Sequence, residues 1–169
     1  MNICLIGDSI TSLALAKNLI NKNIKVFVYY KNNKNFNIQS RTIGISKNNF
    51  DFFNKEIIKF KKSMLWKIKK IEIYSEKLKD EKILNFENNK EELFLTAKNN
   101  EIYELLEKDL KKNKLFKKIL IKNNNFYKKI LKEQKYELII NCDGNIKFLG
   151  IFFIIKLIKV IIVKLIQLL

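Results

Sequence analysis

The 169-residue sequence contains no histidine and no proline, and it has only two cysteines, four glycines and one arginine. The absence of histidine excludes His-based catalytic triads, His₂Cys₂ zinc sites and a haem held by a proximal histidine. Cys4 and Cys142 are too few for a disulfide framework or a four-cysteine metal cluster. We therefore expect no bound metal and a reducing, cytoplasmic setting.

Positive charge dominates the composition: 34 Lys and Arg face 17 Asp and Glu, a formal net charge of +17, with 47% hydrophobic residues. That apolar content argues against a disordered chain. Lysine, isoleucine and asparagine make up 83 of the 169 residues, a bias typical of adenine- and thymine-rich codons. Because lysine is spread along the chain and arginine, the better reader of bases and phosphates, is nearly absent, the sequence disfavours nucleic acid as a partner.

The first thirty residues predict a strand, a helix and a second strand. Residues 3–6 are an apolar run closed by Gly7, which is typical of a buried strand. Apolar residues then recur near helical spacing over residues 10–20, and residues 24–30 are rich in β-formers. These elements make a βαβ unit with parallel strands, so the expected fold class is α/β.

The middle of the chain predicts further, shorter elements. We expect extended chain at 41–45, helices at 48–60 and 101–112, and strands at 65–74, 92–96, 118–121 and 136–141. The run Leu138-Ile139-Ile140 is fully apolar, which predicts a central strand of a parallel sheet. We interpret the acidic residues of the helix at 101–112, Glu107 among them, as a solvated face rather than an acid–base pair.

Residues 7–12, Gly-Asp-Ser-Ile-Thr-Ser, stand between strand and helix, where a dinucleotide fingerprint G-x-G-x-x-G would stand. Ser9 and Ser12 replace its second and third glycines, but serine is small and helix N-terminal amides can still hold a phosphate. The acidic residue that binds a ribose hydroxyl at the end of the second strand is missing, since Tyr30 and Lys31 stand there. From these residues alone, a dinucleotide-binding turn and a plain strand-to-helix turn both stay open.

Two further features are candidates for ligand binding. Arg41 is followed by Thr-Ile-Gly-Ile-Ser, and the alternative interpretation is a simple surface charge. Asp143 and Gly144 directly follow the most apolar predicted strand, at the edge where α/β sheets bind ligands. The alternative there is an ordinary Asp-Gly turn.

The order and spacing of these features resemble one family. They comprise the glycine turn at residue 7, the Arg-Thr-Ile-Gly-Ile-Ser segment from residue 41, Trp66 before Ile71-Glu72-Ile73, a helix opening near Asn99, and Cys-Asp-Gly at 142–144. Over residues 1–144 the chain resembles the ubiquinone-biosynthesis branch of the flavin-dependent aromatic hydroxylases. The resemblance implies an incomplete, Rossmann-like FAD-binding domain.

The resemblance also carries cofactor-binding roles onto six residues: Gly7, Ser9, Ser12, Arg41, Asp143 and Gly144. It implies FAD as cofactor, NAD(P)H as electron donor and an aromatic small molecule as substrate. Members of the family are considerably longer and have a second flavin motif and a substrate-covering sheet, to which nothing in this sequence corresponds. We therefore expect a truncated monooxygenase-like protein that is inactive as it stands, with no assignable catalytic side chain.

The tail, residues 145–169, differs from the preceding chain. Residues 148–169 are almost entirely apolar and are interrupted by Lys156, Lys159, Lys164 and Gln167. The run is long enough for a bilayer, but the lysines oppose burial and fall on one stripe of a helix. We expect an apolar helix, either lying on or spanning the anionic inner membrane or a core helix without its partner. A small basic protein anchored by this tail is the alternative function.

A second hypothesis for the tail is a shift of reading frame. Rereading the codons for residues 147–169 one base out of frame, with the free bases chosen among synonymous codons, gives a Ser-Arg pair and later Ala-Tyr-Thr-Thr. These residues resemble those that come after Asp-Gly in the hydroxylase family. We therefore favour a frameshifted or truncated frame, which resequencing across the codons for residues 144–151 tests.

Overall fold

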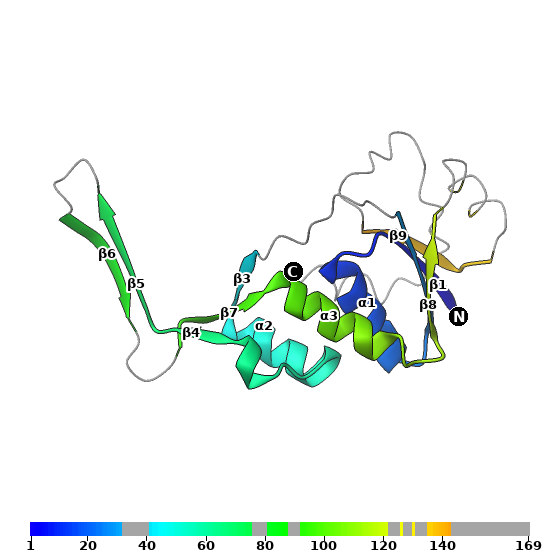
Figure 1. The fold of residues 1–169 in the computed structure, drawn as a ribbon, viewed down its shortest axis with the longest axis horizontal. Helices are drawn as coiled ribbons and strands as arrows, with labels where there is room; N and C mark the ends of the chain where they lie inside the picture. Colours follow the sequence, from blue (N-terminus) through cyan, green and yellow to red (C-terminus); the bar gives the residue numbers. More distant parts are fainter. Residues whose placement is uncertain are drawn as a thin grey trace.

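A four-stranded parallel sheet forms the centre of the protein, in a computed structural model that describes residues 1–31, 41–75, 81–87, 92–121, 126, 130 and 135–142. The strand order is β8-β2-β1-β9. The strands are β1 (Asn2–Ile6), β2 (Lys25–Tyr30), β8 (Phe116–Leu120) and β9 (Leu138–Asn141). All neighbouring pairs are parallel, so their carboxyl ends meet at one edge of the sheet (Figure 1).

The predicted βαβ unit is confirmed, with boundaries within one residue of the prediction. Helix α1 (Ile10–Asn21) joins β1 to β2, and Ile3 of β1 pairs with Val26 of β2. The helix stops because Asn23 adopts a left-handed conformation with φ 61°, which asparagine tolerates better than most residues. The N–H of Asn23 donates a hydrogen bond to the carbonyl of Ile20 at 2.9 Å. This bond satisfies one of the carbonyls that have no partner within the helix.

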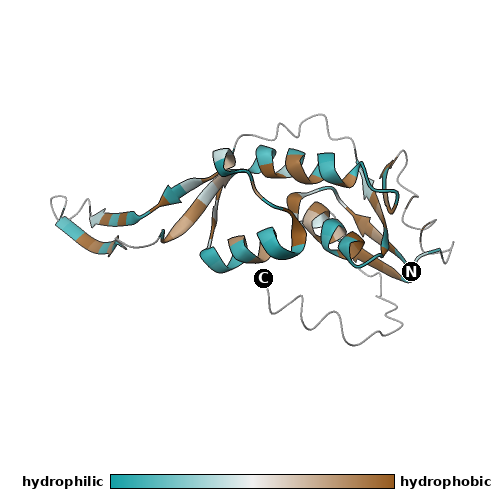
Figure 2. Cartoon of the chain, turned by 90° about the horizontal axis from the view of Figure 1, so that it is seen from below, coloured by the Kyte–Doolittle hydropathy of each residue, from teal (hydrophilic) through white to brown (hydrophobic). Residues whose placement is uncertain are grey.

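Helices cover one face of this sheet. Helix α1 packs on this face, helix α3 (Asn99–Leu110) packs against α1, and the short helix α2 (Lys47–Phe52) lies against β7 (Phe94–Lys98) (Figures 1 and 2). The centre of this layer is made of fully buried aliphatic residues, including Leu5, Leu13, Val28, Leu106 and Leu110. The burial of each such side chain stabilises the fold by about 1.5–3 kcal/mol before conformational entropy is counted.

A second region consists of antiparallel strands. Strands β3 (Thr42–Ile45), β7 (Phe94–Lys98) and β4 (Trp66–Ile68) form a small sheet in the order β3-β7-β4. Strands β5 (Lys70–Ser75) and β6 (Glu81–Glu87) form a hairpin that extends away from the helices (Figure 1). The sequence analysis did not predict β6.

Three predictions about helices and strands are confirmed only in part. The helix expected at 48–60 ends earlier: a π-helical turn (Phe53–Ile57) follows α2, and Asn54 Oδ1 accepts the N–H of Phe60 at 2.9 Å. The rings of Phe50 and Phe60 therefore stack although Phe60 is not helical.

The strand expected at 65–74 is divided at Lys69 between β4 and β5, which belong to different sheets. A 3₁₀ turn (Lys62–Met64) precedes β4. Strand β9 ends the four-stranded sheet instead of lying at its centre, and its residues are only partly buried. An apolar run thus indicates burial against neighbours but does not by itself give the position in the sheet.

The predicted apolar helix of residues 145–169 lies outside the described residues, as do Asp143 and Gly144. In the part of the chain that the structure describes, no helix has the length and apolarity needed to cross a bilayer.

Candidate functional site

The turn after β1 delivers the chain to the carboxyl edge of the parallel sheet. Gly7 has φ 101°, a conformation that residues with a Cβ rarely adopt. Its N–H donates to the carbonyl of Tyr29 at 2.7 Å, so the turn begins where the pairing of β1 with β2 ends. The chain then enters α1 within three residues, and the N-terminus of the helix points at this edge.

The first turn of α1 offers backbone N–H groups and a buried hydroxyl. Ser9 is the N-cap, and its Oγ accepts the N–H of Ser12 at 3.3 Å, so that amide is already used. The N–H groups of Ile10 and Thr11 lie in the first turn, where no intrahelical acceptor exists. With the helix dipole they are suited to an anion such as a phosphate group.

Ser12 connects this turn to the end of β9. Its side chain is fully buried, and its Oγ makes no hydrogen bond of standard geometry to any described residue. Burial raises the pKa of the neighbouring Cys142 thiol, and the Ser12 hydroxyl offsets part of the rise. The N–H of Cys142 donates to the carbonyl of Ile6 at 2.8 Å, which fixes the end of β9 beside the turn.

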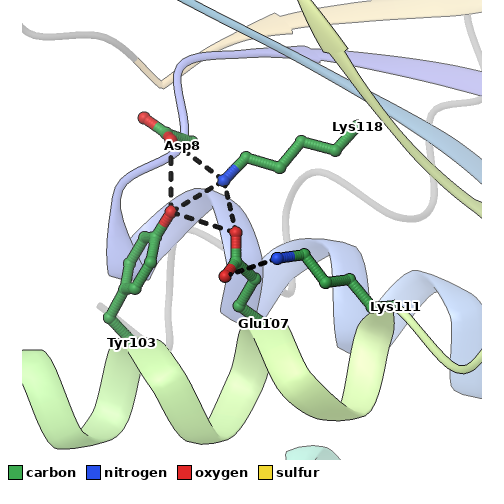
Figure 3. A network of polar contacts seen from close by, with 5 residues as sticks. All are labelled: Asp8, Tyr103, Glu107, Lys111 and Lys118. Atoms are coloured by element: carbon green, nitrogen blue, oxygen red, sulfur yellow. Dashed lines mark hydrogen bonds and ion pairs between the residues drawn. The ribbon is translucent and has the colours of Figure 1, made fainter. Parts of the chain in front are cut away.

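A network of polar side chains lies beside the same turn (Figure 3). Lys118 of β8 stands at its centre: Nζ is 3.2 Å from Asp8 Oδ2, and it donates to Glu107 Oε1 at 2.6 Å and to the Tyr103 hydroxyl at 2.8 Å. The Tyr103 hydroxyl donates to Asp8 Oδ2 at 3.2 Å, and Lys111 Nζ is 2.9 Å from Glu107 Oε2. The network ties the turn, helix α3 and strand β8 together.

The charges of this network are fixed by mutual contacts. Burial alone would raise the pKa of Glu107, but hydrogen bonds from Lys118 and Lys111 outweigh it and hold that pKa below its ordinary value. Burial alone would lower the pKa of Lys118, but Glu107, Tyr103 and Asp8 raise it. Burial raises the pKa of Tyr103 to about 12, and its hydrogen bond with Lys118 offsets part of that rise. At neutral pH Lys118 is thus a cation and Glu107 an anion.

This network corrects one expectation from the sequence. Glu107 is not part of a solvated face, because only 20% of its side chain is exposed and Lys118 and Lys111 bind its carboxylate. The contacts of Asp8, Tyr103 and Lys118 were not predicted from the sequence. One signal was present: Tyr103 and Glu107 are four residues apart, so they share a face of α3.

Arg41 approaches the site through its backbone. Its side chain is exposed, while its carbonyl accepts the N–H of Asn99, the first residue of α3, at 2.8 Å. Tyr103 lies one turn further along α3, about 6 Å away along the axis. The side-chain oxygens Oδ1 of Asn99 and Asn100 are buried and find no donor among the described residues.

Of the six predicted site residues, three form the turn after β1 and a fourth lies near it. Gly7, Ser9 and Ser12 form the turn itself, and the backbone of Arg41 lies at the start of the helix that contacts the turn. Asp143 and Gly144 remain predictions, because they fall outside the described residues. No group of three or more potential metal ligands occurs within the described ranges.

Several features fit the phosphates of an adenine dinucleotide. They are the positive φ of Gly7, the free N–H groups of the first turn, and the buried hydroxyl of Ser12. Two features differ from the usual pattern: Asp8 places a carboxylate in the turn, and β2 ends in Tyr30 without an acidic residue.

No family model matches the sequence, and no curated protein matches it either. Solved structures do share the fold. A 2,6-dihydroxypyridine-3-hydroxylase from Arthrobacter nicotinovorans superposes with a TM-score of 0.51 and 16% identity, over 69% of this chain and 28% of that protein. A p-nitrophenol 4-monooxygenase from Pseudomonas putida DLL-E4 superposes with a TM-score of 0.55 and 9% identity, over 70% of this chain and 31% of that protein. The chain therefore spans less than a third of the length of either structure.

Proposed function

We propose that this chain is the FAD-binding part of a flavin-dependent aromatic hydroxylase of the ubiquinone-biosynthesis type, and that it is inactive on its own. The observation that carries the proposal is the turn at Gly7, which brings the N-terminus of α1 to the carboxyl edge of a parallel sheet. Support comes from the fold, which resembles parts of a hydroxylase and a monooxygenase, and from the sequence resemblance over residues 1–144.

In this proposal the chain's own residues bind and orient the cofactor. The N–H groups of Ile10 and Thr11 hold the pyrophosphate, Gly7 makes the tight turn that brings them to it, and Arg41 adds positive charge. Asp143 and Gly144, which lie outside the described residues, keep the cofactor-binding roles that the family resemblance gives them. In the intact family, bound FAD would supply the hydroxylation chemistry: one atom of O₂ enters the aromatic ring and the other leaves as water, with two electrons from NAD(P)H, while the protein positions the reactants and excludes water.

The proposed inactivity rests on the parts that the sequence does not contain. No segment of it corresponds to the second flavin motif or the substrate-covering sheet of the family, and both similar structures are much longer. Without those parts the reactive ring of the flavin has no enclosed substrate site. We assign no catalytic acid, base or nucleophile to this chain.

Titration of the purified protein with FAD, followed by flavin fluorescence and the visible spectrum, tests the proposal. We expect saturable binding, and we expect Gly7→Ala to weaken it because a Cβ is strained at φ 101°. Gly44→Ala is the matched control, since the added Cβ would only touch the Phe94 ring at 3.4 Å. A protein that neither binds FAD nor gains thermal stability from it contradicts the proposal.

For residues 145–169 we propose a tail that is not native to this domain and arises from a shifted frame. The reading in the neighbouring frame supports this, because it restores family-like residues after Asp-Gly. Sequencing across the codons for residues 144–151 tests it. An intact frame with no coding continuation in the neighbouring frame contradicts it.

The second candidate function, a membrane-anchored basic protein, rests on the apolar, lysine-interrupted composition of the tail. It predicts that the full chain sediments with phosphatidylglycerol vesicles. Replacing Lys156, Lys159 and Lys164 by glutamate should abolish that sedimentation. If the full chain stays in the supernatant, this candidate is rejected.

A further inference from the structure

The usual ribose-binding carboxylate of a dinucleotide site is absent from its usual place. In that pattern an acidic residue at the end of the second strand accepts the ribose 2′-hydroxyl. Here β2 ends at Tyr30, which Lys31 follows, and no acidic residue lies at the carboxyl ends of β2 or β8 in the described chain. A nucleotide held at the turn would need another acceptor for its ribose.

Asp8 is placed to supply that acceptor. Its Oδ2 is held by the Tyr103 hydroxyl and by Lys118 Nζ, each at 3.2 Å. Figure 3 shows the other carboxylate oxygen pointing away from these two partners. About a third of the Asp8 side chain is exposed, and no described residue donates a hydrogen bond to its Oδ1.

Lys118 links Asp8 to the end of β2. Its Nζ lies 4.6 Å from the centre of the Tyr30 ring while it also contacts Asp8. Only the ammonium group of Lys118 therefore separates Asp8 from the end of β2, where the ribose-binding carboxylate usually lies. The same cation reduces the repulsion that a carboxylate in the turn would exert on a pyrophosphate.

We propose that Asp8 is the ribose-binding carboxylate of this site, moved from the end of β2 into the turn, with Lys118 and Tyr103 as its positioning residues. This inference rests on the proposed binding of an adenine dinucleotide. Asp8 Oδ1 accepts a hydrogen bond from a ribose hydroxyl, and its charge disfavours ligands that carry a 2′-phosphate there.

Isothermal titration of the full chain with ADP and with 2′-deoxy-ADP tests the inference, because the two ligands share their phosphates and differ in one hydroxyl. We expect the wild-type protein to prefer ADP by about tenfold, the value of one hydrogen bond to a charged group. Asp8→Ala should abolish the preference, and Asp8→Asn, which keeps a neutral acceptor, should restore part of it.

Asp51→Asn is the matched control, because it removes one negative charge at an exposed position of α2 and should preserve the preference. Thermal unfolding of each variant checks that it is folded. If Asp8→Ala alters the affinities for ADP and 2′-deoxy-ADP by the same factor, in either direction, Asp8 acts on folding or on the phosphates and the inference is wrong. If the wild-type protein binds neither ligand, the proposed function itself fails.

Discussion

The helix-covered parallel sheet and the β5–β6 hairpin both contain large apolar residues, but these residues lie in different environments. In the helix-covered sheet, Leu13 and Leu106 are fully buried, whereas Leu84 and Phe86 of the hairpin are 47% and 49% exposed. Strands β5 and β6 pair only with each other in the described chain, and an isolated two-stranded hairpin is marginally stable in water. Apolar residues therefore stabilise this protein where other side chains cover them, on either face of the parallel sheet, and contribute less in the exposed hairpin. Figure 2 shows that the hairpin also carries apolar residues.

The two regions also differ in their ion pairs. Lys118 in the helix-covered sheet is 14% exposed and binds Glu107, while the hairpin pairs Glu72 with Lys70 and Lys82 at the surface. Hydrogen bonds from Lys82 and Lys70 lower the pKa of Glu72, but these two lysines are 43% and 46% exposed. Exposed pairs of this kind contribute little to stability.

The largest expected effect is a cavity in the buried layer. Leu106→Ala should lower the free energy of unfolding by about 2–5 kcal/mol, because a fully buried leucine leaves an unfilled space. Leu84→Ala in the hairpin, the matched control, should change it by less than about 0.5 kcal/mol. Urea unfolding followed by circular dichroism measures both. Equal losses would show that the hairpin is buried in solution.

An intermediate effect is expected at the turn. Gly7→Ala should cost about 1–3 kcal/mol, because an alanine at φ 101° is strained whatever space surrounds it. Gly44→Ala in β3 has no positive φ and should be close to neutral. Thermal unfolding of both variants checks this pair. A Gly7→Ala protein as stable as wild type would mean that the turn adopts another conformation.

The smallest expected effect depends on pH. Because the pKa of Glu107 is lowered in the folded state, its contribution is present above its unfolded value near 4.5 and is lost as the pH falls through the folded value. Glu107→Gln should therefore cost about 1 kcal/mol at pH 7 and almost nothing at strongly acidic pH.

Glu72→Gln is the control from the hairpin and should have a smaller effect at pH 7, since its partners Lys70 and Lys82 are 46% and 43% exposed. Urea midpoints at pH 7 and pH 3 provide the measurement. If Glu107→Gln and Glu72→Gln shift the urea midpoint by the same amount at both pH values, the Lys118 network stabilises the protein no more than the hairpin pair does.

The elements formed by neighbouring residues could be predicted from the sequence. The first strand, turn and helix follow from an apolar run, a glycine and helical spacing, all within residues 2–21. Their strand pairing was also predictable, because a helix of this length connects parallel strands.

Contacts between residues far apart in the sequence could not be predicted from such local patterns. Strand β6 alternates lysine, glutamate and apolar residues, and its pairing with β5 becomes visible only in three dimensions. Lys118 meets Asp8 across 110 positions of sequence, and nothing in a lysine-rich chain distinguishes this lysine from the others. The position of β9 at the end of the sheet depends equally on tertiary contacts.

The binding of an adenine nucleotide at the turn is the central claim, and an ¹⁵N-resolved NMR titration of the protein with ADP tests it most directly. The account predicts that the amide signals of Gly7, Ile10 and Thr11 shift progressively and saturate, while those of β5 and β6 do not move. Unchanged signals at the turn, with or without shifts elsewhere, would contradict the claim.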